Sequence, residues 1–218
     1  MSGHSVIAIV QARMSSRGFP GKVLTPFKGR AILEHVLAAV EQVLPPANVL
    51  IATSVESSDD AIVDFAAARG TRVFRGDLAN VLARFQDAAR HGDDDWILRV
   101  SADSPMLDPE VLRRVVAAAS TDVDLVTTIR PRTFPKGRNA ELIRRALLLG
   151  IDANIATQEE REHVTQYFYN RAGAFRIRNI ESGHPEWAGE SLAVDTPDDL
   201  SALERLTADQ VARFSLTS

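Results

Sequence analysis

The sequence predicts a three-layer α/β fold in which helices cover both faces of a mostly parallel central sheet. Short apolar segments rich in β-branched residues alternate with longer segments whose apolar residues recur at helical spacing. This alternation implies right-handed crossovers between parallel strands, with a helix in each crossover. A chain of 218 residues suits a single domain, so we expect residues 1–218 to form one.

The elements follow in chain order. We expect strands at residues 5–10, 49–52, 72–74, 96–100, 123–128 and 175–180, the last of which alternates like a strand that leaves the main sheet. Helices are expected at residues 31–44, 59–69, 78–91, 109–119 and 142–149. Residues of the types that begin or end helices support several of these boundaries: Ser57 or Ser58, Gly70, Asp108-Pro109-Glu110, and the capping box Thr157-Gln-Glu-Glu160.

Composition excludes several classes of protein. The chain has no Cys, so it has no disulfide framework, thiolate metal site or cysteine nucleophile. Neither a signal peptide nor a membrane-spanning stretch is visible, and we expect a soluble cytoplasmic protein with no membrane partner. A net charge of −4 argues against nucleic-acid binding.

A cationic loop from Gln11 to Lys22 joins the first strand to the first helix. Five cations precede the first acidic residue, Glu34, and they are Arg13, Arg17, Lys22, Lys28 and Arg30. A loop between a strand and a helix can direct backbone N–H groups and cations at phosphate oxygens. The spacing of Gly18 and Gly21 is not that of a Walker A motif, so spacing alone favours phosphate binding only slightly.

Two aspartates strengthen the prediction of a phosphate site. Asp103 follows the strand at 96–100, and Asp195 follows an apolar run at 192–194 that we take as another strand. If both strands run parallel to the first, both carboxylates emerge beside the cationic loop. Mg²⁺ is commonly held by one or two carboxylates plus substrate phosphates. Taken singly, each Asp is better interpreted as a turn residue, and it is the convergence of both with the cationic loop that favours a metal site.

Other catalytic patterns are missing from the sequence. The five His residues form no metal-binding spacing, and His35 and His163 fall in expected helices, where packing or hydrogen bonding is the better interpretation. Ser101 and Ser104 lie outside any G-x-S-x-G motif, which leaves a hydrolase unsupported.

At this point the sequence resembles the cytidylyltransferases that activate acidic sugars. Within them it is most similar to the spore-coat polysaccharide biosynthesis group related to CMP-Kdo and acylneuraminate synthetases. The resemblance runs from about Val6 to Leu206 and is carried by residues 9–14, 19–24, 33–36, 74–77, 80–84, 99–105, 134–137, 161–165 and 194–198. It implies a Rossmann-like nucleotidyltransferase fold, similar to GT-A, and attack of a sugar hydroxyl on the α-phosphorus of CTP to give a CMP-sugar and pyrophosphate.

The resemblance also implies roles for particular residues. Asp103 and Asp195 would hold Mg²⁺, and Arg13 and Lys22 would bind the triphosphate. The remaining nucleotide contacts would come from Gln11, Ala12, Arg17, Arg84 and Ser101, and the acceptor sugar would meet Arg130, Lys136, Asn139 and Glu141. Residues 132–190 would form an excursion for acceptor binding and dimerisation, with residues 161–169 in a homodimer interface.

Three departures from the family pattern stand out. Gly18 occupies a position where the family usually has Arg, and the cation lies one place earlier at Arg17. Lys136 and Asn139 stand where the family usually has acidic residues, so Glu141 is the only acidic residue left in residues 134–141. This difference indicates an unusual acceptor. Ala102 stands where Gly is common in the family, and alanine is tolerated there if the backbone at this residue has a negative φ.

Two alternatives stay open. A glycosyltransferase could place a nucleotide-sugar and a metal at a similar sheet edge, although no Asp-x-Asp motif ends a strand. A nucleotide-binding paralogue without turnover would account for Gly18, Lys136 and Asn139.

Overall fold

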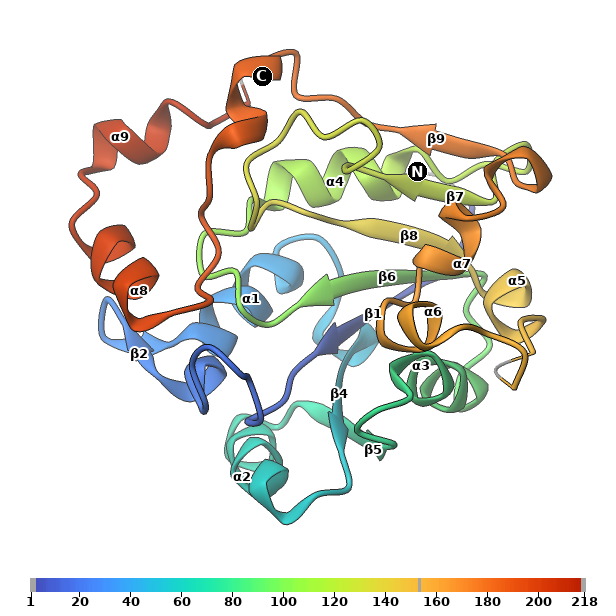
Figure 1. The fold of residues 1–218 in the computed structure, drawn as a ribbon, viewed down its shortest axis with the longest axis horizontal. Helices are drawn as coiled ribbons and strands as arrows, with labels where there is room; N and C mark the ends of the chain where they lie inside the picture. Colours follow the sequence, from blue (N-terminus) through green and yellow to red (C-terminus); the bar gives the residue numbers. More distant parts are fainter. Residues whose placement is uncertain (1–2, 153, 217–218) are drawn as a thin grey trace.

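The protein is built around a seven-stranded sheet in the order β5-β4-β1-β6-β8-β7-β9, seen in a computed structural model that describes residues 3–152 and 154–216. Helices lie on both sides of this sheet (Figure 1). Of the six strand pairings, those of β8 with β6 and with β7 are antiparallel and the other four are parallel. The predicted fold class is therefore confirmed.

Most predicted elements are present, with shifted ends. The sheet contains β1 (Val6–Gln11), β4 (Val49–Ser54), β5 (Arg72–Gly76), β6 (Trp96–Ser101), β7 (Leu125–Thr127), β8 (Glu141–Arg144) and β9 (Ile177–Asn179), and a separate hairpin joins β2 (Pro26–Phe27) to β3 (Arg30–Ala31). The helices are α1 (Ile32–Glu41), α2 (Asp60–Arg69), α3 (Val81–Arg90), α4 (Pro109–Ala117), α5 (Arg145–Leu149), α6 (Gln158–Glu162), α7 (Gln166–Tyr169), α8 (Pro197–Glu204) and α9 (Ala208–Ala212). No helix in the described ranges combines the length and apolarity that crossing a membrane requires.

The core lies on both faces of the sheet. Val6, Ala8 and Val10 of β1 pack in the cluster that contains the apolar sides of α1, α2 and α4. Ile7 and Ile9 point the other way, into the cluster that contains α3, α5 and α7. Because both faces are covered, the strand is apolar at every position from Val6 to Val10, as is usual for parallel sheets.

Three predicted helix signals are confirmed. The Asp108 side chain accepts a hydrogen bond from the Glu110 N–H, with Pro109 as the first residue of α4. Thr157 and Glu160 form the expected capping box at the start of α6. Gly70 ends α2 with φ 72°, a left-handed conformation that glycine adopts without a Cβ penalty.

The predicted cap of α2 is wrong. Neither Ser57 nor Ser58 caps this helix, because residues 57–59 form a 3₁₀ turn and Asp59 occupies the N-cap position. Asp59 makes no capping hydrogen bond with its side chain, which instead turns toward the loop after β1. The start of α3 moves from residue 78 to Val81, because the Asn80 side chain accepts a hydrogen bond from the Ala83 N–H and caps it there.

Three predictions for the second half differ from the structure, although α5 lies within the predicted helix and β9 within the predicted strand. Residues 142–149 are not one helix, because Leu142 and Ile143 belong to β8 and are fully buried between β6 and β7. The strand predicted at 175–180 does not leave the main sheet, since β9 pairs with β7. Residues 192–194 lie outside the strands and contain a bend at Ala193, and the Val194 N–H bonds to the Asp103 carbonyl at 2.9 Å.

The C-terminal segment packs against the first helix through a third apolar cluster. This cluster joins Phe27 and Ile32 to Trp187, Leu192, Val194, Leu203 and Phe214. In Figure 1, α8 lies next to β2 at the left edge of the molecule, and α9 lies beyond α8. The segment between Trp187 and α8 therefore passes next to the carboxyl end of β6.

Glu160 gives the link between α6 and α7 a pH dependence. Arg171 donates to its carboxylate, as do Asn170 and the Thr157 N–H, and these bonds lower the pKa of Glu160 from 4.5 to about 2. A depressed pKa contributes stability above the unfolded value, and this contribution is lost as the pH falls from about 4.5 to about 2. We expect Glu160→Gln to lower the free energy of unfolding at pH 7 by on the order of 1 kcal/mol. Urea denaturation should show the difference from wild type shrinking below pH 4.5, and a difference that is constant with pH would contradict it.

Candidate active site

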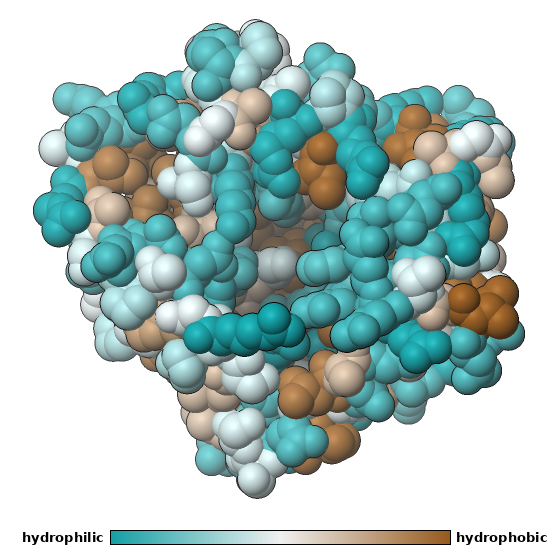
Figure 2. Space-filling view, viewed as in Figure 1, coloured by the Kyte–Doolittle hydropathy of each residue, from teal (hydrophilic) through white to brown (hydrophobic). Residues whose placement is uncertain are grey.

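Strands β1 and β6 deliver the first site residues to one edge of the sheet. Gln11 and Ser101 end these strands as neighbours in register, and the Ala102 N–H donates to the Gln11 carbonyl at 2.9 Å. Figure 2 shows a hollow bordered mainly by hydrophilic residues near the centre of this face. Ligands of α/β sheets bind beyond the carboxyl ends of strands, where this hollow lies.

A buried carboxylate fixes the loop after β1. The carboxylate of Asp59, fully buried, accepts hydrogen bonds from the Met14 N–H at 2.7 Å, the Ser54 N–H at 2.9 Å and the Thr53 hydroxyl at 2.9 Å. Burial raises the pKa of Asp59, but these hydrogen bonds and the one from the Ser54 hydroxyl lower it by a larger amount. The net pKa therefore lies below its ordinary value. Asp59 therefore stays ionised and ties the loop to β4.

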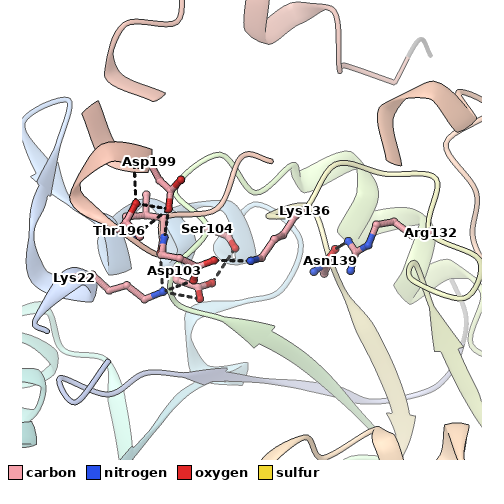
Figure 3. A network of polar contacts seen from close by, with 10 residues as sticks. Lys22, Asp103, Ser104, Arg132, Lys136, Asn139, Thr196 and Asp199 are labelled. Atoms are coloured by element: carbon pink, nitrogen blue, oxygen red, sulfur yellow. Dashed lines mark hydrogen bonds and ion pairs between the residues drawn. The ribbon is translucent and has the colours of Figure 1, made fainter. Parts of the chain in front are cut away.

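Lys22 lies at the centre of the site (Figure 3). Its buried Nζ donates to Asp103 Oδ2 at 3.1 Å, to Asp195 Oδ1 at 2.9 Å and to the Val194 carbonyl at 2.6 Å. The structure thus brings a cation of the N-terminal loop, an aspartate two residues after β6 and the C-terminal segment to one point. Asp195 follows residues 192–194, which the Val194–Asp103 backbone bond holds beside the end of β6.

A second lysine ammonium group contacts Asp195. Lys136 Nζ bonds to its Oδ2, opposite the contact of Lys22 with Oδ1. Partial burial raises the pKa of Asp195, and the two lysines lower it by more, so the net pKa lies below the ordinary value. The carboxylate is therefore ionised at neutral pH.

The donor set fits a divalent cation that arrives with phosphates. One nitrogen contacts both Asp103 and Asp195, so a single cation between these carboxylates could contact both. Across residues 3–152 and 154–216 there is no cluster of three or more His, Cys, Asp or Glu suited to a metal. Two carboxylates supplemented by substrate phosphates are a usual way to hold Mg²⁺.

Two adjoining cavities could receive a ligand. The first, of about 300 Å³, is lined by Gln11, Arg13, Ser16, Lys22, Val23, Arg99, Ser101, Ala102, Asp103, Glu162, His163 and Asp195. The second, of about 690 Å³, shares Arg13 and Glu162 with it and extends along Ser15, Arg17 and residues 77–80. Arg13 lies on the boundary, 4.0 Å from Glu162 Oε1. The two cavities therefore meet at Arg13 and Glu162, which line both of them.

The sequence-predicted nucleotide residues fall into three groups. Gln11, Arg13, Lys22 and Ser101 line the first cavity beside Asp103 and Asp195. Arg17 borders the second cavity instead. Ala12 is buried just behind the loop, where its N–H bonds to the Ala52 carbonyl at 3.1 Å.

Arg84, the remaining predicted nucleotide residue, lines neither cavity. It is fully buried, and its Nη1 donates to the Asp77 carbonyl at 2.7 Å. Burial, followed by the nearby charge of Arg13, lowers the pKa of Arg84 to about 10. Its contact with Asp77 supports the loop along the second cavity.

The predicted acceptor residues are not gathered into one place. Lys136 joins Asp195, whereas Asn139 accepts a hydrogen bond from Arg132 on the side of Lys136 away from Lys22 (Figure 3). The buried Glu141 carboxylate bonds to Arg99 and to the Tyr169 hydroxyl. The Arg130 guanidinium lies 4.4 Å from the centre of the Tyr169 ring.

Arg99, Glu162 and His163 line the first cavity and were not among the residues predicted for the site. Arg99 interrupts the apolar strand β6 and bonds to Glu141 and, at 3.3 Å, to Gln11 Oε1, so its position in the strand was an available signal. Glu162 and His163 come from the end of α6, and no spacing in the sequence links them to the loop. His163 follows α6 instead of lying within a helix, whereas His35 lies in α1 and donates to the Phe27 carbonyl at 2.7 Å, as a hydrogen-bonding role predicts.

Two family departures have structural explanations. A Cβ at Gly18 would lie 2.7 Å from the Asp195 carbonyl oxygen, so this loop passes too close to the C-terminal segment for any side chain there. Ala102 is not among the described residues with positive φ, and its methyl group is therefore tolerated.

A mostly parallel sheet with a cationic loop and two carboxylates at its carboxyl edge is typical of α/β proteins that bind phosphate-containing ligands. Residues 7–216 match the family model for cytidylyltransferases. The chain is 31% identical over 209 residues to the spore coat polysaccharide biosynthesis protein SpsF of Bacillus subtilis, covering 93% of this chain and 86% of that protein. Its structure resembles a cytidylyltransferase from Leptospira borgpetersenii with a TM-score of 0.87 and 27% identity, covering 95% and 90% of the two chains. It shares its fold with a CMP:2-keto-3-deoxy-manno-octonic acid synthetase complexed with CTP, at a TM-score of 0.69, 19% identity and coverage of 94% and 99%.

The chain belongs to the cytidylyltransferase family, and it is a nucleotidyltransferase. Family membership therefore gives no support to the glycosyltransferase alternative.

Proposed function

We propose that this enzyme transfers CMP from CTP to a hydroxyl group of a sugar or sugar acid. The observation that carries the proposal is the meeting of Lys22 with Asp103 and Asp195, next to Arg13, at the carboxyl edge of the sheet. In the reaction, the acceptor oxygen bonds to the α-phosphorus while the bond from that phosphorus to the pyrophosphate oxygen breaks. The hydroxyl proton passes to solvent, and pyrophosphate leaves.

The residues of the loop would bind and orient the triphosphate. Lys22 and Arg13 supply positive charge from two sides of the first cavity, and backbone N–H groups of the Asp59-anchored loop add donors. Asp103 and Asp195 would hold Mg²⁺, which when bound neutralises phosphate charge. Such transfer depends mainly on positioning and charge neutralisation, which these groups can provide.

The two cavities suggest how the nucleotide lies. The triphosphate would occupy the first cavity beside Lys22, and the nucleoside would extend past Arg13 toward residues 77–80 of the second. The SpsF relative supports a role in surface polysaccharide or glycoconjugate synthesis, and the relatives support CTP as the nucleotide. A homodimer through residues 161–169 and a cytoplasmic location remain parts of the proposal.

A pyrophosphate-release assay tests the proposal. The full chain with Mg²⁺ is offered each of the four ribonucleoside triphosphates together with panels of sugar acids, sugar phosphates and neutral sugars. We expect release that needs CTP, the cation and an acceptor, and a CMP-sugar identified by mass spectrometry. Tight CTP binding by calorimetry with no release for any acceptor would favour the paralogue without turnover, and preference for another nucleotide would contradict the proposal.

A further inference from the structure

Lys136 supplies an ammonium group to a carboxylate that the proposed function assigns to a metal. Its Nζ bonds to Asp195 Oδ2, while Lys22 occupies Oδ1 of the same carboxylate. The Lys136 side chain is 53% exposed, and that of Asp195 is 45% exposed. An exposed ion pair would normally contribute little, so the geometry that holds Lys136 in place decides its importance.

The backbone around Lys136 is built against the segment that leads to Asp195. The Lys136 N–H donates to the Glu190 carbonyl at 2.9 Å, and the Lys136 carbonyl accepts from the Leu192 N–H at 2.7 Å. Gly137 follows with φ 95°, and a Cβ there would lie 2.6 Å from the Leu192 carbonyl carbon. Only glycine lets the two segments approach so closely, and this approach places Lys136 beside Asp195.

All four carboxylate oxygens of the pair have donors from the chain itself. Lys22 contacts Asp103 Oδ2 and Asp195 Oδ1, the Ser104 hydroxyl donates to Asp103 Oδ1 at 3.1 Å, and Lys136 takes the fourth oxygen. Two ammonium groups balance two carboxylates. A divalent cation arriving alone would have to displace hydrogen-bonded ammonium groups and would meet their like charge at short range.

We propose that Lys136 is a resident counter-cation that keeps free divalent metal out of the nucleotide-free site. The metal then enters together with the triphosphate, whose negative charge draws the ammonium away from Asp195. Lys136 thus sets the order in which the metal and the nucleotide bind. The inference rests on the proposed metal role of Asp103 and Asp195.

Mn²⁺ binding to the nucleotide-free full chain tests this inference. Electron paramagnetic resonance measures free Mn²⁺ during titration of wild type and Lys136→Gln. We expect Lys136→Gln to bind Mn²⁺ at least about tenfold more tightly, since one competing cation has gone. Equal affinities in the two proteins would overturn the inference.

Three further variants locate the effect. Lys136→Arg keeps the charge, and Lys28→Gln removes one charge from an exposed lysine on the β2–β3 hairpin, so both should stay within about twofold of wild type. Adding Asp195→Asn to Lys136→Gln should abolish the gain, because the freed carboxylate is then missing. A gain that survives in the double variant, or that Lys28→Gln reproduces, would overturn the inference. Matching urea midpoints for wild type and Lys136→Gln would show that folding is unaffected.

The outcome is separable from that of the proposed function. Tighter Mn²⁺ binding by Lys136→Gln in a protein that does not bind CTP would overturn cytidylyl transfer and retain the inference about Lys136. CTP-dependent pyrophosphate release together with unchanged Mn²⁺ affinity in Lys136→Gln would support cytidylyl transfer and overturn the inference about Lys136.

Discussion

Replacement of Asp103 by alanine is expected to lower kcat for CTP-dependent pyrophosphate release by about 10³-fold. Asp103 is one of the two carboxylates that meet Lys22, and its loss would leave the proposed divalent cation with Asp195 as its single protein ligand. Charge that develops on the phosphates would then be poorly neutralised. Steady-state kinetics with saturating CTP measure the effect.

A matched control separates this effect from a general loss of charge. Asp64 is exposed on α2, outside the residues that line the two cavities, and Asp64→Ala should keep wild-type kcat. Asp195→Ala should resemble Asp103→Ala. Wild-type turnover in Asp103→Ala would remove that carboxylate from the catalytic machinery.

The second large effect is on stability, through Asp59. We expect Asp59→Ala to lower the free energy of unfolding by about 3 kcal/mol, because it leaves buried donors of Met14, Thr53 and Ser54 without an acceptor. The loop after β1 should also lose its fixed conformation. Urea denaturation measures the loss of stability, and calorimetry should show weaker CTP binding at temperatures where the variant is folded.

The neighbouring aspartate is the control for Asp59. The Asp60 side chain is 57% exposed and pairs with Arg75 at 2.7 Å, so Asp60→Ala should cost less than about 1 kcal/mol. If Asp59→Ala were no less stable than Asp60→Ala, the Asp59 carboxylate would not be the anchor of the loop.

Local patterns were sufficient for most elements in the first half of the fold, although they misplaced the cap of α2 and did not predict the β2–β3 hairpin. The apolar run of β1 and the cap at Asp108 depend on neighbours in the sequence, and both were predicted from them. The helix prediction for residues 142–149 failed in part because a short apolar run fits a buried strand and a helix equally well. Only pairing with β6 and β7 made Glu141–Arg144 a strand.

Site residues that end strands could be predicted from the sequence, and the contacts of site residues that lie in loops could not. Gln11 and Ser101 end neighbouring parallel strands, so their proximity follows from the topology. Asp195 was expected beside Lys22 for a wrong reason, since the residues that precede it form a connection and not a strand. The contact of Lys136 with Asp195 joins residues 59 positions apart and depends on the close approach at Gly137, which no local pattern encodes.

We propose that Lys22, Asp103 and Asp195 surround a metal-bound triphosphate. A crystal structure of the full chain with CTP and Mn²⁺ tests this arrangement through anomalous scattering from the metal. We expect one anomalous peak within coordination distance of both carboxylates and of phosphate oxygens, with Lys136 released from Asp195. A triphosphate bound away from Lys22, or a metal that contacts neither Asp103 nor Asp195, would contradict it.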